Sequence, residues 1–513
     1  MIDMRVWRPV RMASLPLSDR YNFIRSQCFL KDKYTAAAGV FEKLKARLVG
    51  RGDMQDKTLY DDLSSPTVAT TSVLITVAIA AFEKRHMMSL DVPGAFLNAD
   101  MKATGVTVRM LLDPTMTAIL VKMDPTYGQY VNDNGTCLVE LDKALYGTVE
   151  AAKLWYDMIT GVLLGEGFVA NPYDRCVLNK VGQHGHQVTI CLHVDDLLVT
   201  CEDRNELDAV QRFLADRFGD VTVHRGGVIN YVGMTFDLAS RPGICEVTMN
   251  GMTDDLVASS GVTRARATPA ADNLFEVRDD ADRLVGNDEV FFRTYTMKLL
   301  YLAKRVRPEC LTAVAFLTTR TQACDSDDMG KLHRVIGYLY GCPHRGIALD
   351  IGSEGPNVRS YIDAAYGMHT RSGKSHTGSV IVLGNQGPVY VSSSKQKIVT
   401  KSSTEAELVG LSDAATQALH TRHFIEAQGY ATAPLTIYQD NMSCMSLIKR
   451  GGPCSQRSRH ISIRRFWLKE RVDGGEVVIR HMATGDMVAN ILTKPVQGMQ
   501  FLKERQGLTN WDR

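Results

Sequence analysis

Two adjacent aspartates, Asp195 and Asp196, lie between two apolar runs in residues 188–200 (VTICLHVDDLLVT). Because both runs are rich in residues that favour strands, the pattern predicts a β-hairpin with the two carboxylates at its turn. Two charges on a buried scaffold are costly unless they are paired or bind a metal. Other acidic pairs, at 61–62, 254–255, 279–280 and 327–328, have the surroundings of loops and helix ends. From the residues alone, a metal role and a purely structural role stay equally open for Asp195 and Asp196.

A third carboxylate stands in similar surroundings. Asp91 lies within residues 89–97 (SLDVPGAFL), a partly apolar strand that ends in a turn. Three carboxylates from two strands can hold two Mg²⁺ ions about 4 Å apart, the arrangement that supports in-line displacement at a phosphate. Oxygen ligands without Cys or His favour Mg²⁺ over Zn²⁺. The three acids therefore indicate a phosphoryl-transfer site.

The aspartates and four further motifs, taken in order, resemble the reverse transcriptase of copia-type LTR retrotransposons. The motifs are KARLVGRG at 45–52, LYG at 145–147, AKLWY at 152–156 and YVGM at 231–234. The resemblance extends from about residue 29 to near the end of the chain. The order of the motifs, rather than any one of them, makes the resemblance specific.

The resemblance implies a role for each matching residue of the palm. Asp91, Asp195 and Asp196 would be the catalytic carboxylates that bind metal. Phe96 would be the steric gate, an aromatic ring that leaves no room for a ribonucleotide 2′-hydroxyl. The alternative for Phe96 is an ordinary core aromatic.

The resemblance also implies contacts to the nucleotide and to the primer. Lys45 and Arg47 would lie on the fingers and neutralise the incoming triphosphate, with a solvated basic face as the alternative. The primer grip, which is otherwise a buried strand, would comprise Tyr231, Val232, Gly233 and Met234.

Two positions depart from the family pattern. His193 replaces the aromatic residue that usually precedes Val-Asp-Asp, and it places a titratable group beside the metals. Glu150 stands in the tract that often reads Leu-Lys-Gln-Ala-Pro, and it cannot donate the amide hydrogen bond of glutamine. This tract therefore lacks the hydrogen bond that the family's glutamine offers to the nucleotide.

From Val358 the pattern changes to three strands, a helix, a fourth strand, and a last strand followed by a helix. Asp363 falls on the first strand, Glu407 on the first helix and Asp440 at the end of the fourth strand. This order, with KSSTEAEL at 401–408, YQDN at 438–441 and ILTKP at 491–495, resembles the ribonuclease H of the same retrotransposons. The resemblance implies a mixed five-stranded sheet on which these three acids are catalytic and bind metal.

Two glutamates compete for the helical position of this second site. Residues 404–407 (TEAE) have the spacing of a capping box, in which Glu407 would bond to its own helix N-terminus. We favour Glu407 over Glu405 as the catalytic residue, because Glu407 begins the apolar face that packs on the sheet.

The fourth acid of the family pattern is replaced in this chain. Asn490 stands where the family has aspartate before Ile-Leu-Thr-Lys, so its amide oxygen would bind metal without supplying charge. Asp486, on a helix predicted near 486–494, is a substitute for it or else a helix N-terminal acid favoured by the dipole. His481, at the end of the preceding strand, is a proton shuttle or else a surface histidine.

The predicted fold class is α+β: a reverse transcriptase palm and fingers, a helical connection, and a ribonuclease H-like mixed five-stranded α/β domain. We expect fingers and palm in 1–266, a linker and helical connection or thumb region in 267–355, the ribonuclease H-like domain in 356–495 and a C-terminal tail in 496–513. Residues 267–287 look like a linker, because they mix Thr, Pro, Ala and acidic residues without apolar periodicity.

Bulk composition constrains the function little. The net charge of +2 does not indicate a nucleic-acid enzyme, so phosphate contacts must come from local clusters of the 59 Lys and Arg residues. Eleven cysteines without a C-x-x-C pair fit reduced thiols in an intracellular protein. The longest mainly apolar stretch, 73–82, is too short to span a bilayer and predicts a buried helix. Two basic clusters could follow a hybrid duplex: the first is Lys395, Lys397 and Lys401, and the second is Lys449, Arg450, Arg457, Arg459, His460, Arg464 and Arg465.

The sequence thus predicts an RNA-directed DNA polymerase with ribonuclease H activity. The resemblance implies two Mg²⁺ ions per active site, with Mn²⁺ as the alternative. It also implies an RNA template, a DNA primer, an RNA–DNA hybrid and dNTPs as partners, no membrane, and a cytoplasmic virus-like particle with access to the nucleus. The alternatives are an inactive transposon relic or co-opted nucleic-acid-binding protein, favoured by His193, Glu150 and Asn490, and a polymerase without nuclease activity.

Overall fold

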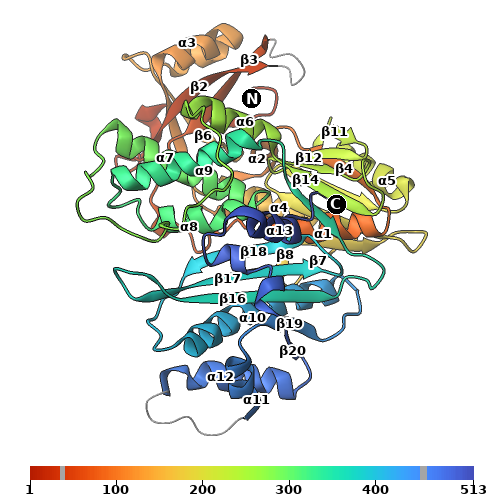
Figure 1. Cartoon of the computed structure of the whole chain (residues 1–513). Helices are drawn as coiled ribbons and strands as arrows, with labels where there is room; N and C mark the ends of the chain where they lie inside the picture. Colours follow the sequence, from red (N-terminus) through yellow and green to blue (C-terminus); the bar gives the residue numbers. More distant parts are fainter. Residues whose placement is uncertain (35–40, 451–458, 513) are drawn as a thin grey trace.

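The computed structural model describes residues 1–34, 41–450 and 459–512 of the chain. Helices and four β-sheets alternate along these residues, so the predicted α+β class is confirmed. Figure 1 shows the N-terminal sheet at one end of the molecule, the C-terminal sheet near the other, and helices α7, α8 and α9 beside the middle. Across the described ranges, every helix is too short or too polar to cross a membrane.

The first sheet carries a long two-stranded arm. Its order is β1 (Trp7–Pro9), β6 (Cys137–Leu141), β5 (Arg109–Leu112), β2 (Ile24–Tyr34) and β3 (Phe41–Gly50). β2 and β3 pair antiparallel, with Arg47 opposite Phe29 and Lys45 opposite Lys31. Lys45, Arg47 and Phe29 are exposed, so this arm presents basic and aromatic side chains to solvent.

The second sheet holds the predicted aspartate hairpin. Its order is β11 (Thr222–Arg225), β4 (His86–Asp91), β10 (Asp196–Cys201), β9 (Gln187–His193), β8 (Asp174–Val181) and β7 (Val169–Asn171). Helix α1 (Thr70–Phe82) is buried from Ser72 to Ala81, which confirms the predicted buried helix. Helix α4 (Ala151–Gly165) buries Trp155, Ile159 and Leu163 at intervals of four residues, one apolar stripe of an amphipathic helix.

The third sheet joins two distant parts of the chain. Its order is β12 (Val228–Tyr231), β13 (Met234–Asp237), β14 (Ile244–Thr248) and β15 (Ile347–Asp350). Between β14 and β15 the chain forms α6 (Asn250–Ser260), α7 (Asn287–Ala303), α8 (Leu311–Thr318) and α9 (Ser326–Gly341). The helical character predicted for this region is confirmed.

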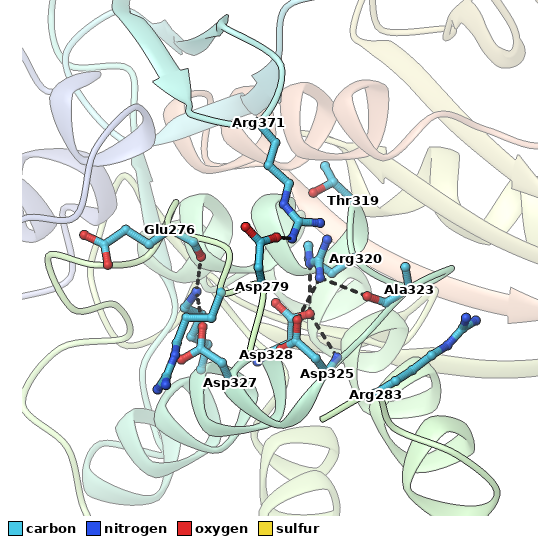
Figure 2. A network of polar contacts seen from close by, with 12 residues as sticks. Glu276, Asp279, Arg283, Thr319, Arg320, Ala323, Asp325, Asp327, Asp328 and Arg371 are labelled. Carbon is cyan, nitrogen blue, oxygen red and sulfur yellow. Dashed lines mark hydrogen bonds and ion pairs between the residues drawn. The ribbon is translucent and has the colours of Figure 1, made fainter. Parts of the chain in front are cut away.

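The predicted linker, 267–287, forms no regular helix or strand before Asn287, but part of it is packed. Leu274 and Phe275 are buried, and the Phe275 ring lies 5.6 Å from that of Phe316 and 5.0 Å from that of His369. Figure 2 shows Arg371, from the hairpin that follows β16, reaching Asp279 of the same segment. The segment therefore ties the C-terminal sheet to the helices, although its buried residues show no apolar period; they are Thr268, Pro269, Ala270, Leu274 and Phe275.

The fourth sheet is the mixed five-stranded sheet expected after residue 356. Its order is β18 (Pro388–Lys395), β17 (Lys374–Leu383), β16 (Val358–His369), β19 (Leu435–Gln439) and β20 (Val477–His481). The first three strands pair antiparallel, whereas β19 is parallel to both β16 and β20. Helix α10 (Ser403–Ala427) packs on this sheet, and α11 (Met442–Arg450) and α12 (Arg459–Asp473) pack beside it.

The C-terminal residues differ from the expected helix and tail. Residues 486–494 do not form a helix; two short 3-10 turns, η8 (Thr484–Asp486) and η9 (Asn490–Leu492), stand there instead. The expected tail contains α13 (Gly498–Thr509), which buries Phe501 and Leu508. In Figure 1, α13 (dark blue) lies between the fourth sheet and the green helices.

Candidate active sites

The palm acids meet at one end of the second sheet. Asp196 begins β10 and is the direct partner of Asp91 on β4, so the two face each other in register. Asp195 lies in the turn between β9 and β10, where its carbonyl oxygen accepts a 3.0 Å hydrogen bond from the backbone N–H of Val92. The Trp155 indole N–H donates to the carbonyl of Val194 at 2.6 Å and holds the turn from the other side.

The turn itself is backbone-strained. Val194 has a φ of 58°, in the left-handed region that β-branched residues rarely adopt. Such a conformation persists only where the surrounding contacts fix it, and it is found most often at functional sites.

The palm carboxylates repel one another. The pKa of Asp196 is raised to about 6, chiefly because surrounding protein desolvates the carboxylate and then because Asp195 and Asp91 are near. Burial, followed by Asp195, raises the pKa of Asp91, while Lys45 opposes that shift. Oxygen ligands with uncompensated negative charge fit a divalent cation. Unlike the acids of the second site described below, the oxygens of these three do not converge within 4.8 Å in the described part of the chain.

Phe96 follows Asp91 by five residues and packs against Tyr146. Gly94, with a φ of 61°, turns the chain into the short helix α2 (Ala95–Asn98) that carries Phe96. The Phe96 ring is half-buried, and its centroid lies 4.6 Å from that of Tyr146. Burial and then the charge of Asp195 raise the pKa of the Tyr146 hydroxyl, so the ring pair lies within electrostatic reach of the acids.

The basic residues of the arm lie toward the same site. The charge of Lys45 lowers the pKa of Asp91, and that of Arg47 lowers the pKa of Tyr146, although burial dominates both shifts. Both side chains are exposed. Because they lie two positions apart on β3, Lys45 and Arg47 project from the same face of the arm.

The predicted primer-grip residues form a hairpin turn with an anchored base. Tyr231 and Met234 are buried cross-strand partners, and the Tyr231 hydroxyl donates to the Cys191 carbonyl at 2.8 Å. Between them, Val232 and Gly233 adopt positive φ values of 46° and 77°. Only Gly233 is exposed, so the turn offers its backbone to a ligand while its ends pack inside.

The two residues that depart from the family pattern, His193 and Glu150, have different surroundings. Burial lowers the pKa of His193, Asp195 opposes that shift and Arg305 adds to it. Within the described residues, the His193 Nδ1 atom is buried without a hydrogen-bond partner. Glu150 is buried and accepts hydrogen bonds from the Tyr60 hydroxyl at 2.8 Å and from Gln55 Nε2 at 2.9 Å. Glu150 therefore holds the loop at residues 55–60 in place.

The second site brings three acids together. Asp363, Glu407 and Asp440 each offer one oxygen, and these atoms all lie within 4.8 Å of one another. The sheet explains the meeting: Tyr361 of β16 is the partner of Tyr438 of β19, so the residues two positions further along both strands stand side by side. Helix α10 then supplies Glu407 from the face that packs on the sheet.

The second site is an acidic cluster in which positive charge does not balance every carboxylate. The pKa of Glu407 is raised to about 9 by burial, then by Asp363 and Asp440. Burial raises the pKa of Asp363 too, although Lys494, whose Nζ lies 3.7 Å from Asp363 Oδ2, opposes the shift. Three converging hard oxygen ligands of this kind fit Mg²⁺ or Mn²⁺.

Neighbouring side chains orient the three acids. Thr493 Oγ1 donates to Asp363 Oδ2, Gln439 Nε2 donates to Glu407 Oε2 at 3.2 Å, and Thr484 Oγ1 donates to Asp440 Oδ2 at 2.8 Å. These contacts were not predicted, because they join segments distant in sequence.

The capping interpretation of Glu407 is wrong. The helix is capped by Ser402, whose hydroxyl accepts the backbone N–H of Glu405, while the Glu405 carboxylate accepts the N–H of Lys401 at 2.7 Å. The cap begins two residues earlier than the spacing suggested. Glu407 is thus left to face Asp363 and Asp440.

The three residues predicted around the fourth acid of the nuclease pattern differ in burial and in contacts. Asn490 is buried; its Nδ2 donates to the Thr484 carbonyl at 2.6 Å, and its Oδ1 makes no hydrogen bond in the part of the chain that the structure describes. Asp486 is exposed and pairs with Lys503 at 3.0 Å, and the helix predicted to carry it does not form. His481 is exposed at the end of β20, opposite Gln439.

The basic clusters are only partly on the surface. Arg465 is buried, Arg464 pairs with Asp413, and Arg457 lies outside the described residues. Lys449 and Arg450 are exposed at the last turn of α11. In the first cluster, Lys397 and Lys401 are exposed at the end of β18 and before α10.

Comparison with known proteins identifies the class. The family model described as reverse transcriptase (RNA-dependent DNA polymerase) matches residues 11–270. The chain belongs to this family.

The relatives narrow the class to the Pol region of copia- and Ty1-type retrotransposons. The chain is similar to the retrovirus-related Pol polyprotein from transposon RE2 of Arabidopsis thaliana, with 29% identity over 474 residues, 90% of this chain and 30% of that protein. It is also similar to the corresponding polyprotein from transposon TNT 1-94 of Nicotiana tabacum (24% identity over 466 residues, 90% and 33%) and to the Ty1-GR2 Gag-Pol polyprotein of Saccharomyces cerevisiae (23% over 471 residues, 88% and 25%). The chain spans about a third or less of the length of these relatives.

Solved structures match more distantly. Prototype foamy virus protease-reverse transcriptase matches with 10% identity and a TM-score of 0.26, covering 96% of this chain and 53% of that one. LC11-RNase H1 in complex with an RNA/DNA hybrid matches with 12% identity and a TM-score of 0.21, covering 27% of this chain and 94% of that one.

Proposed function

We propose that the chain is an RNA-directed DNA polymerase with ribonuclease H activity, which copies retrotransposon RNA into DNA and degrades the RNA of the hybrid. The observation that carries the proposal is the convergence of Asp363, Glu407 and Asp440 on a five-stranded mixed sheet, in a chain whose first half belongs to the reverse transcriptase family. We assign the polymerase to 1–266, the connection or thumb to 267–355, the nuclease to 356–495 and a C-terminal extension to 496–513.

In the polymerase site, Asp91, Asp195 and Asp196 would hold the divalent cations. Two bound Mg²⁺ or Mn²⁺ ions supply electrostatic stabilisation of the charge that develops on the phosphate. Phe96, whose ring packs against Tyr146, would exclude a 2′-hydroxyl from the nucleotide. Lys45 supplies positive charge near the same carboxylate.

The other polymerase contacts follow from the arm and the hairpin turn. Arg47, like Lys45, is exposed on β3 and is suited to a triphosphate. The exposed backbone at Gly233, held by buried Tyr231 and Met234 with Val232 between them, is suited to the primer strand.

In the nuclease site, Asp363, Glu407 and Asp440 would hold the cations, with Asn490 behind them. Glu407, whose pKa is raised to about 9, carries a proton at neutral pH when no cation is bound. Binding of a divalent cation therefore releases that proton, which makes metal affinity rise with pH. His481, exposed at the adjoining strand end, would move a proton during release of the product.

A second candidate is a catalytically inactive relic or co-opted nucleic-acid binder. Two observations favour it: the amide at residue 490, which supplies no charge, and the neutral His193 beside Asp195. A chain that keeps polymerase activity and lacks only ribonuclease H activity is a less extreme version of this alternative.

The test is primer extension on poly(rA)/oligo(dT) with Mg²⁺, beside release of labelled RNA from a preformed hybrid. We expect the Asp195→Asn/Asp196→Asn protein to lose extension and Asp440→Asn to lose RNA release. Asp254→Asn/Asp255→Asn, an exposed acidic pair on α6, is the matched control and keeps both activities. Folded protein that binds the hybrid yet shows neither activity would establish the inactive binder instead.

A further inference from the structure

A cavity of about 450 Å³ lies where the palm, the helical connection and the C-terminal sheet meet. Its lining comes from the start of α1, from the end of α7 and the residues after it, from α8, and from β18. Both α1 and α8 contact β18, and Figure 1 shows α8 beside that strand. The cavity is therefore shared by the part of the chain that carries the palm acids and the part that carries the nuclease acids.

The lining of this cavity carries positive charge and includes no acidic residue among those that the structure describes. Lys304 and Arg305 supply the charge, and within the described ranges neither forms an ion pair. Arg305 is half-buried, and its Nε atom is buried without a hydrogen-bond partner there. Because a partly desolvated cation without a carboxylate partner is costly, the cavity is suited to an anion.

Hydroxyl groups add further donors on two sides of the cavity. Thr70 and Thr71 stand at the start of α1, and Ser392 and Ser394 stand on β18. In residues 1–34, 41–450 and 459–512, none of these four hydroxyls has a hydrogen-bond partner. Hydroxyls together with Lys and Arg are the side chains that bind the phosphates of nucleic acids without reading the base sequence.

Arg305 is connected to the hairpin turn that we propose for the primer strand. Its guanidinium carbon lies 3.5 Å from the centroid of the Tyr301 ring. The Tyr301 hydroxyl donates to the Val232 carbonyl at 3.4 Å, and it lies 3.2 Å from the point where a side chain at Gly233 would begin. The turn, Tyr301 and Arg305 thus form a continuous chain of contacts from Gly233 to the cavity.

We propose that this cavity binds a backbone phosphate of the nucleic-acid duplex between the polymerase site and the nuclease site, with Lys304 and Arg305 as the cations and the four hydroxyls as further donors. The inference rests on the proposed function, because it needs a hybrid that binds across both sites. It assigns no contact to a base, so binding at this subsite is independent of sequence.

The first measurement is the affinity of the full chain for an RNA–DNA hybrid at several salt concentrations, in EDTA so that neither reaction proceeds. We expect Lys304→Gln/Arg305→Gln to weaken binding by roughly tenfold, as for the loss of one charge-assisted hydrogen bond. The slope of log affinity against log salt should fall by about 1. Ser394→Asp, which adds negative charge from β18, should weaken binding as well.

A matched control removes the same charge from the same helix. Arg293 and Lys298 are exposed on α7 and lie outside the cavity. Arg293→Gln/Lys298→Gln should therefore leave both the affinity and the salt slope unchanged. Urea unfolding checks that each variant is folded. An equal loss of affinity in the control and in Lys304→Gln/Arg305→Gln would show a general charge effect and overturn the proposal.

A scan of the hybrid locates the phosphate. One phosphate at a time is replaced by an uncharged methylphosphonate. The native chain should bind more weakly when one internal linkage is changed, and Lys304→Gln/Arg305→Gln should be insensitive to that linkage. If both proteins respond alike at every linkage, the proposal is overturned.

The outcomes separate this subsite from the proposed function. If the native chain extends DNA and releases RNA while Lys304→Gln/Arg305→Gln binds the hybrid as tightly as the native chain, the subsite is overturned and the function stands. If neither reaction occurs but one linkage still depends on Lys304 and Arg305, the subsite stands and the catalytic proposal fails. If the variant loses binding of inorganic phosphate alone, with hybrid binding unchanged, the cavity takes free phosphate and the assignment to a duplex is overturned.

Discussion

Arg85, at the start of the palm sheet, donates a hydrogen bond from Nη2 to the hydroxyl of Tyr430, at a distance of 3.0 Å and 345 positions later in the chain. The Tyr430 hydroxyl donates to Glu83 Oε1 at 2.8 Å, and Arg85 pairs with the other oxygen of Glu83. Gln187 of β9 adds a bond to the Gln428 carbonyl at 2.8 Å. The palm sheet and the end of helix α10 are thereby joined by part-buried polar contacts, which fixes the separation of the two acidic sites.

Removal of the Tyr430 hydroxyl tests this junction. Tyr430→Phe leaves Arg85 and Glu83 each with one contact fewer in a half-buried setting, so we expect a loss of about 1–3 kcal/mol in the free energy of unfolding. Urea unfolding followed by fluorescence measures it. Tyr366→Phe, which alters an exposed tyrosine of β16, should change stability by less than about 0.5 kcal/mol. Equal effects of the two substitutions would contradict the account of the junction.

The nuclease acids should cost stability when no metal is bound. The folded-state pKa of Glu407 is raised to about 9 from 4.5, so its protonated form favours folding and that stabilisation is lost as pH rises from about 4.5 to 9. In EDTA at pH 8, Glu407→Gln should therefore unfold at higher urea concentration than the native chain, and the gap should close toward pH 5. If the difference in urea midpoint between the two proteins widened as pH falls, the predicted direction of the pH dependence would be wrong.

The buried histidine pair should make the chain sensitive to acid. His369 Nε2 lies 3.0 Å from His376 Nδ1, and burial lowers their pKa values to about 4 and about 3. Because the unfolded chain protonates both near pH 6.5, stability should fall by about 1.4 kcal/mol per histidine and pH unit below that value. Urea unfolding at several pH values, compared between the native chain and His376→Asn, isolates the contribution. A difference between the two proteins that is constant from pH 7 to 5 would refute it.

Phe96 should control the choice of sugar. Phe96→Val removes the ring beside Asp91, so we expect incorporation of ribonucleotides to rise relative to deoxyribonucleotides by roughly tenfold or more. The ratio of kcat/KM for the two nucleotides in primer extension is the readout. Phe213→Val, at a half-buried aromatic of α5 (Arg204–Phe218), leaves the ratio unchanged. An unchanged ratio in Phe96→Val would show that Phe96 has only an ordinary packing role.

Local patterns in the sequence predicted much of the scaffold. The apolar runs flanking Asp195 and Asp196 form the expected hairpin, residues 73–82 form a buried helix, and Asp363, Glu407 and Asp440 meet. These features depend on periodicity and element order, which are visible along the chain.

What the sequence did not reveal depends on contacts between distant segments. The pairing of Asp91 with Asp196 is a sheet register, which no local pattern specifies. Glu504 is one acid in an otherwise amphipathic stretch, and only the packing of α13 makes it buried. The cap at Ser402 was misassigned because Ser402, Ser403 and Thr404 are all good N-cap residues, and tertiary packing chose among them.

The most direct test of the central claim, two separate metal-dependent sites on one chain, uses one substrate for both reactions. An end-labelled RNA template annealed to a DNA primer carrying a second label is incubated with dNTPs and Mg²⁺, and both strands are followed in the same reaction. We predict that the native chain extends the DNA and shortens the RNA, that Asp195→Asn/Asp196→Asn only shortens RNA, and that Asp440→Asn only extends DNA. Loss of both reactions in either folded variant, or their survival in both, would contradict the claim.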